Sequence, residues 1–219
     1  CQCRQVQQDG WMTLFKPNGQ LLPLSQFRAA LEAGADPNEC WRSIDHEQTH
    51  HPFLMAAQRH IHHLRLLLAH PKIDIAVKDR DGSNALIVAA KYNHVQAIEP
   101  LIRAGVPVNQ ADRFGATPLH YAVHMDGVGP LRQLLLAGAN PNAQAVYGRT
   151  PLGELMMIMP ADETGQALKV RALMAHGADP MMVSVHQRTE TMINLARERL
   201  SRHIHPIPRV PELAHERRM

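Results

Sequence analysis

Apolar residues recur at helical intervals in the clearest stretch of the chain, residues 112–144. Leu119, Ala122 and Val123 lie three and four positions apart, so one face of a helix would carry all three. The run Leu134–Leu136 marks a second helix further along. We therefore predict two helices here, the first with its apolar face turned toward the neighbouring part of the chain.

The residues at the ends of these helices agree with that interpretation. Thr117 is a typical N-cap residue, and Pro118 follows at the first helical position, where its missing N–H costs nothing. Gly138 stands just past the second helix, where a positive φ ends a helix at little cost. Gly115 has the same freedom for a tight turn before the first helix. The order predicted is a turn, two helices and a closing glycine.

This pattern returns at a fixed interval of 33 residues. The positions that keep the interval are Gly82, Gly115 and Gly148; Asp79 and Asp112; Asn84, Thr117 and Thr150; Gly105 and Gly138; and Asn109 and Asn142. A sequence period of this size is the signature of a solenoid, in which each repeat stacks on its neighbours.

The 33-residue template divides most of the chain into units. They are a half repeat at 24–38, full repeats at 46–78, 79–111, 112–144 and 145–182, and a degenerate unit at 183–201. In the first full repeat His70-Pro71-Lys72 replaces the closing glycine, which predicts a longer loop. The repeat at 145–182 carries six extra residues, and we expect residues 160–165 to form a loop between its helices. Residues 15–21, with Pro-Asn-Gly at their centre, predict a small hairpin turn.

The run Thr117-Pro118-Leu119-His120, followed after the second helix by Gly138-Ala139-Asn140, resembles the ankyrin repeat. The resemblance implies an all-α solenoid of about five stacked helix-turn-helix repeats with finger turns and degenerate caps. It makes residues 24–201 the ankyrin-repeat domain, with 1–23 as an N-terminal extension or cap and 202–219 as a Pro-containing tail. It also implies that His120 ties neighbouring turns together by hydrogen bonds.

The composition narrows the function classes. Hydrophobic residues make up 45% of the 219 residues and charged residues 20%, which is typical of a soluble globular chain. A net charge of +3 is too small to indicate nucleic acid, so we expect no nucleic-acid partner. Aromatic residues make up only 4% of the chain, which argues against a β-sandwich core. Three cysteines are too few for a fold held together by disulfides.

The resemblance implies a protein partner on a concave face built from the finger turns and the first helices. The template places outward, on the fingers, Arg80, Asp81, Ser83, Arg113, Phe114, Ala116, Tyr147 and Arg149. On the first helices it places outward Gln58, Arg59, Lys91, Tyr92, His124, Met125, Met157 and Ile158. Aromatic residues, methionine and arginine together are the composition of a binding hot spot. Exposed apolar residues are also common on surfaces without a partner.

The sequence offers little catalytic or metal chemistry. Seven of the fifteen histidines fall between positions 46 and 70, and His60 and His63 would share a helix face. No cysteine or carboxylate spacing completes a metal shell around them, so we predict neither a metal nor a cofactor. A His-rich metal or redox accessory protein is the alternative. The chain has no Gly-rich phosphate loop and no His-Glu-x-x-His motif, and we expect it not to be an enzyme.

The cysteine at position 1 suggests a location. It resembles the mature end of a bacterial lipoprotein, with a lipid on Cys1 and with Gln2 compatible with sorting to the outer membrane. The cysteine also fits a chance occurrence. With a lipid the chain would face the periplasm, where Cys3 and Cys40 would be able to pair. A lipid-anchored binding protein without a catalytic site is similar to immunity proteins, which inhibit a secreted toxic enzyme. The alternative is a cytosolic or host-delivered ankyrin adaptor.

Overall fold

The computed structural model describes residues 14–16, 18–42, 49–157 and 163–182, and in these ranges the helices pair as the period predicts. The helices are α1 (Leu24–Glu32), α2 (Pro52–Arg59), α3 (Ile61–Leu68), α4 (Ala85–Lys91), α5 (Val95–Arg103), α6 (Pro118–Ala122), α7 (Gly129–Leu136), α8 (Pro151–Met157) and α9 (Glu163–Ala175). Strands β1 (Trp41–Arg42) and β2 (Thr49–His50) and the 3-10 turns Val146–Gly148 and Pro180–Met182 complete the described elements.

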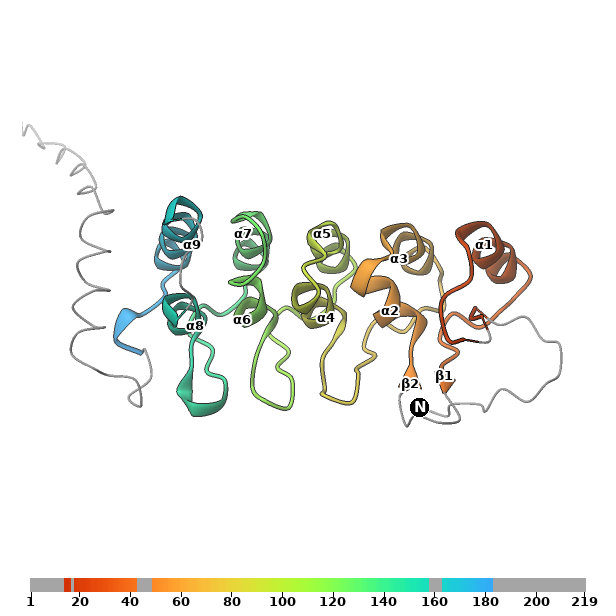
Figure 1. Ribbon diagram of the computed structural model, residues 1–219, viewed down its shortest axis with the longest axis horizontal. Helices are drawn as coiled ribbons and strands as arrows, with labels where there is room; N and C mark the ends of the chain where they lie inside the picture. Colours follow the sequence, from red (N-terminus) through yellow and green to blue (C-terminus); the bar gives the residue numbers. More distant parts are fainter. Residues whose placement is uncertain (1–13, 17, 43–48, 158–162, 183–219) are drawn as a thin grey trace, which may run out of the picture. The chain divides into compact units, whose positions relative to one another are not determined.

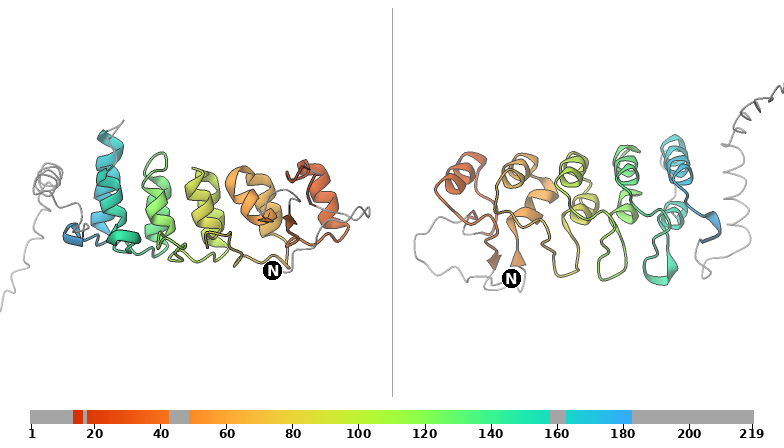
Figure 2. Two further views of the ribbon diagram at one scale, coloured as in Figure 1. Left: turned by 60° about the horizontal axis from the view of Figure 1, so that its bottom comes forward. Right: turned by 180° about the vertical axis from the view of Figure 1, so that it is seen from behind.

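Two rows of helices form the described part of the chain, as Figure 1 shows. One row, the inner helices, consists of α2, α4, α6 and α8, and the other, the outer helices, consists of α1, α3, α5, α7 and α9. The fingers extend from the side of the inner helices, and Figure 2 shows the same rows from behind. The predicted all-α solenoid is confirmed, with a single short β1–β2 ladder in the described residues, in which Trp41 pairs with His50.

The apolar core runs along the stack between the two rows. Leu119 and Ala122 of the inner helix α6 have no exposed surface, and Val123 is also buried, as their spacing predicted. The outer helices contribute one large core residue after another, such as Leu101 and Leu131. No described helix has the length and the apolar character that crossing a bilayer requires.

A capping slot explains why Asn84, Thr117 and Thr150 keep the 33-residue interval. The Asn84 side chain accepts a hydrogen bond from the Ile87 amide at the start of α4, at 3.0 Å. The Thr150 hydroxyl accepts one from the Gly153 amide at the start of α8, at 3.1 Å. Each bond satisfies one of the backbone donors that a helix start leaves without a partner.

His120 extends this capping to the next repeat. Its Nδ1 accepts a hydrogen bond from the Thr117 amide at 3.1 Å, and its Nε2 lies 3.0 Å from the carbonyl oxygen of Arg149. The first contact belongs to the start of α6 and the second to the finger of the following repeat. The structural role implied for His120 by the resemblance is confirmed.

An asparagine ladder accounts for a second repeating column. The amide of Asn109 donates to the Gly138 carbonyl at 2.9 Å and accepts from the Asn140 amide at 2.8 Å. Asn142 makes the same pair of bonds to Gly177 and Asp179, at 2.8 and 2.7 Å. Each asparagine therefore holds the closing turn of one repeat against that of the next.

Two loop predictions have different outcomes. Sixteen residues separate α3 from α4, whereas fourteen separate α5 from α6 and α7 from α8, so the longer loop at His70 is confirmed. The loop expected at 160–165 is wrong in its second half, because α9 already begins at Glu163. One glycine, Gly165, costs a helix only about 1 kcal/mol. Gln166 in the same turn donates to the Leu155 carbonyl at 2.9 Å and holds this turn against α8.

The start of the described chain forms the expected small hairpin. Phe15 and Leu21 face each other in an antiparallel bridge, and the Lys16 amide donates to the Gln20 carbonyl at 2.7 Å. Leu14 is fully buried in the same core as the helices, which is how a cap covers the end of a solenoid. The degenerate unit 183–201 and the tail 202–219 lie outside the described residues and stay predictions.

His51 occupies the capping slot of the first full repeat but does not cap. It lies 33 positions before Asn84 and is buried, and neither ring nitrogen has a hydrogen-bond partner among the described residues. Burial lowers the pKa of His51 to about 4, although the carboxylates of Asp74 and Asp36 oppose the shift. The folded state therefore holds this ring neutral.

Acid is expected to destabilise the protein through His51. In the unfolded chain His51 takes up a proton near its ordinary pKa of 6.5, and in the folded chain only near pH 4. Stability due to this group is complete above pH 6.5 and falls as the pH drops, by about 2–3 kcal/mol between pH 7 and 4.5. The variant His51→Asn, which copies the capping residue Asn84, should show a smaller pH dependence in urea unfolding measured at both pH values. Equal pH dependence in the two proteins would contradict this assignment.

Candidate protein-binding surface

The finger that carries Phe114 is a tight turn held by one carboxylate. Oδ1 of Asp112 accepts hydrogen bonds from the amides of Phe114 and Ala116, at 2.8 and 3.0 Å, and its Oδ2 accepts from the Tyr121 hydroxyl at 2.7 Å. Gly115 completes the turn with a φ of 74°, which glycine adopts readily. The finger is therefore rigid, and its tip projects Phe114.

The finger before it has the same construction, and the finger after it differs. In the former, Oδ1 of Asp79 accepts from the amides of Asp81 and Ser83, at 2.9 and 2.8 Å. In the latter, Ala145 stands where the carboxylate would be, and the tip forms a 3-10 turn in which Tyr147 has a φ of 60°. A positive φ is uncommon for a bulky residue and directs the tyrosine side chain outward at some conformational cost.

Backbone hydrogen bonds join the three fingers to one another. The Arg113 amide donates to the Asp81 carbonyl at 2.7 Å, and the Val146 amide donates to the Phe114 carbonyl at 2.8 Å. The tips are thus fixed at the spacing of the repeats rather than free to move apart. This row of fingers and the adjoining ends of the inner helices are called the finger face below.

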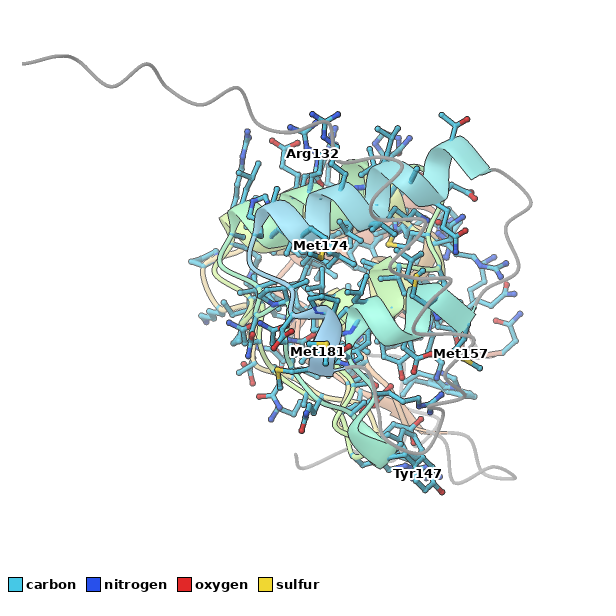
Figure 3. All side chains as sticks on the ribbon, turned by 90° about the vertical axis from the view of Figure 1, so that its left-hand side faces the viewer. Arg132, Tyr147, Met157, Met174 and Met181 are labelled. Carbon is cyan, nitrogen blue, oxygen red and sulfur yellow. The ribbon has the colours of Figure 1, made fainter. Side chains whose placement is uncertain are left out.

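Large apolar side chains are exposed on the finger face. Phe114 is 42% exposed and Tyr147 is 79% exposed, and Tyr92 and Met157 are exposed at the ends of α4 and α8. Figure 3, which looks along the stack from the end with α8 and α9, shows Tyr147 at the finger tip and Met157 at the end of α8 above it. The finger face therefore exposes aromatic and methionine side chains both at the finger tips and at the ends of the inner helices.

Charged side chains hold these apolar groups in place. A guanidinium nitrogen of Arg113 lies 3.0 Å from a carboxylate oxygen of Asp81, and the same guanidinium sits 4.7 Å from the centre of the Phe114 ring. Arg149 pairs with Glu154 at 3.1 Å. These pairs contribute little to stability at the surface, but they restrict the rotamers of the side chains around the aromatic tips.

The predicted surface residues fall into groups by exposure. The exposed ones are Arg59, Arg80, Lys91, Tyr92, Arg113, Phe114, His124, Tyr147 and Met157. Those that are half-buried are Gln58, Asp81, Ala116 and Arg149. Two are buried, Ser83 and Met125, each 1% exposed. Ile158 and the proposed lipidation site Cys1 lie outside the described residues.

The outward placement predicted for Ser83 and Met125 is wrong for two local reasons. Ser83 is part of the finger's return, where its amide and carbonyl both bond to Asp79, and the chain enters the core at the next residue. Met125 shares a slot with the exposed Tyr92, but α6 ends at Ala122 and the chain after it folds inward. The Lys169 ammonium of α9 donates to the Met125 carbonyl at 2.6 Å and fixes that path.

Sequence reasoning missed one apolar residue of the finger face, Val146. It is exposed beside Tyr147 at the third finger tip. The signal was available, because Val146 lies 33 positions after Arg113 and therefore had to occupy an outward slot. An apolar residue in that slot adds to the surface that a partner would cover.

The weak metal candidates His60 and His63 do come together. Their ring centres are 5.4 Å apart, and burial, followed by the neighbouring charge of His63, lowers the pKa of His60. The His63 ring is already in use, since its Nε2 lies 2.9 Å from the Leu22 carbonyl oxygen and it packs against the Phe27 ring in a T-shaped contact. No group of three potential ligands occurs in the described part of the chain. His63 thus packs between α3 and the first half repeat, whereas His60 is exposed beside it.

Comparison with known families gives one match. Residues 53–145 match a family model described as ankyrin repeats in three copies. This range runs from the second residue of α2 past the end of α7 and includes the first two of the fingers described above. No curated protein matches the chain.

Proposed function

We propose that this chain, which is an ankyrin-repeat protein, binds another protein through its finger face. Ankyrin repeats indicate a protein–protein interaction module, and proteins built from them are in general binding modules rather than enzymes. The observation that supports this choice of surface is the exposure of Phe114 and Tyr147 on neighbouring finger tips joined by a backbone hydrogen bond.

Preorganised finger tips favour binding through this face. Aromatic residues are only 4% of the chain, yet two of them occupy the same exposed slot in consecutive repeats. Large rigid side chains held on rigid turns lose little conformational entropy on binding, so more of the buried apolar area contributes to affinity. Arginine beside an aromatic ring is a frequent combination at binding hot spots, and Arg113 over Phe114 provides it.

The most specific form of the proposal concerns the partner. We infer a secreted toxic enzyme whose active site the finger face covers, with the chain acting as an immunity protein in the periplasm. Projecting aromatic tips support this form, because enzyme active sites are concave clefts lined largely by apolar groups. The envelope location stays a prediction.

Inhibition of the captured partner tests this form. The full chain, used as bait in an envelope extract, is expected to retain an enzyme, and adding purified chain in equal amounts should abolish that enzyme's activity. The variant Arg103→Gln, altered on an outer helix, serves as the matched control and should inhibit as well as the unaltered chain. A partner that keeps its activity when saturated with the chain would exclude the inhibitory role while leaving protein binding intact.

A further inference from the structure

The outer helices carry a second repeated feature, a row of arginines. In four of the five, arginine directly follows a residue that lies in the core or packs against it, and the pairs are Phe27–Arg28, Leu64–Arg65, Leu131–Arg132 and Val170–Arg171. These four arginines, called the arginine row below, are exposed. In α5 the same slot holds Glu99, which pairs with Arg103 one turn later.

Stacking places these residues in line. Equivalent slots of successive repeats lie side by side, and packed helices are about 8–10 Å apart, so the row extends for roughly 40 Å. Among the described side chains, none of the four arginines of the row is in an ion pair. Figure 3 labels Arg132 at the top of the stack, on the opposite side from Tyr147 at the finger tip. The arginine row and the finger face therefore point in opposite directions.

Among the described residues, carboxylates are less frequent on the outer helices than in the fingers and turns. Apart from Glu163 at the start of α9, whose side chain is not described, the outer helices expose five arginines and two glutamates, Glu32 and Glu99. Lys169 points back to the carbonyls of Val123 and Met125. Every described aspartate lies outside the helices, in the fingers and turns. The outer helices therefore carry a local excess of positive charge. On the finger face, by contrast, Lys91, Arg113 and Arg149 pair with carboxylates.

Exposed leucines accompany the arginines. Leu136, four residues after Arg132 on the same helix face, is 75% exposed. Leu168, three residues before Arg171, is 46% exposed. A basic surface with interspersed leucines is the composition of segments that lie on a membrane, where the cations meet headgroups and the apolar groups enter the boundary below them.

We infer that the arginine row binds the surface of an anionic membrane. A plane of anionic headgroups presents charge to arginines on all of the stacked helices at once, whereas the phosphates of a nucleic-acid duplex curve away from such a row. The leucines gain burial in lipid and gain nothing from a phosphate backbone. The finger face then points away from the membrane and stays open to a protein partner. Membrane binding by this row needs no lipid on Cys1.

Vesicle binding by the unlipidated full chain tests the proposal. The chain is expected to co-sediment with phosphatidylcholine vesicles that contain about 30% phosphatidylserine, and not with pure phosphatidylcholine, at about 0.1 M salt. The double variant Arg65→Gln, Arg132→Gln should reduce the partition coefficient about 30-fold, the value for two charges near an anionic surface. The control Lys72→Gln, Lys78→Gln removes two exposed charges from the loop between α3 and α4 and should bind as the unaltered chain does.

The outcomes separate the explanations. Loss in the arginine variant with retention in the control supports the proposal, as does weaker vesicle binding by Leu136→Ser. Equal loss of vesicle binding in both double variants would show that only the net charge matters and would overturn the proposal. The absence of binding to phosphatidylserine vesicles would also overturn it, and so would tighter binding to a DNA or RNA duplex at the same salt. All altered side chains are exposed, and thermal unfolding of each variant checks that the fold is intact.

Discussion

Replacing both Phe114 and Tyr147 by alanine is expected to weaken partner binding by about 2–4 kcal/mol. The two rings are the most prominent apolar groups on the finger tips, and a partner that covers them removes their surface from water. Because both side chains project from turns that the backbone and, in one case, a buried carboxylate hold together, their removal leaves the fingers formed. Titration calorimetry with the captured partner, on the variant and on the unaltered chain, measures the difference.

The matched control lies on the opposite side of the stack. Val95→Ala with Leu136→Ala also removes two exposed apolar side chains, but from outer helices, and should leave partner affinity unchanged. Urea unfolding of both double variants should agree with the unaltered chain within about 0.5 kcal/mol. If the finger variant loses several kcal/mol of stability instead, the two rings belong to the fold and not to a binding surface.

Replacing Leu101 by alanine is expected to reduce the free energy of unfolding by about 2–5 kcal/mol. Leu101 lies on α5, in the middle of the stack, and has no exposed surface. Its removal leaves a cavity between the two rows of helices, and each repeat depends on its neighbours for burial of its apolar face. Urea unfolding followed by circular dichroism measures the loss.

The same substitution at Leu136 provides the comparison. Leu136 is also on an outer helix, but its side chain is 75% exposed, so Leu136→Ala should change stability by no more than about 0.5 kcal/mol. Losses of unfolding free energy of similar size at both positions would contradict the placement of Leu101 in the core and of Leu136 in solvent.

Much of the fold was predictable because the residues that recur every 33 positions form hydrogen bonds to the backbone. Asp112 holds a finger, Thr117 and His120 start a helix, and Asn109 joins two closing turns. Each of these bonds is local or reaches only the next repeat, so a fixed sequence interval is enough to locate it. The departures come from the length of single helices. The early end of α6 turns Met125 inward, and the early start of α9 converts part of an expected loop into helix.

The location of the candidate site on the fingers was predictable, but the exposure of its individual residues was less so. The template identifies outward slots, and it placed Phe114 and Tyr147 correctly in exposed positions. It failed at Ser83, where the finger already returns to the core, because a sequence interval does not predict how deeply a side chain is buried. The arginine row escaped sequence reasoning because the template places binding residues on the fingers and first helices and none on the outer helices. The four arginines also do not keep the 33-residue interval, since the segments between successive outer helices differ in length.

Hydrogen exchange of the chain with and without its partner is the most direct test of the finger face. The amides of the finger turns at 112–116 and 145–149 should exchange more slowly in the complex, and those of the outer helices α5 and α7 should exchange at the same rate as in the free chain. Protection of α5 and α7 with unchanged exchange in the fingers would show that the partner binds elsewhere and would contradict the account.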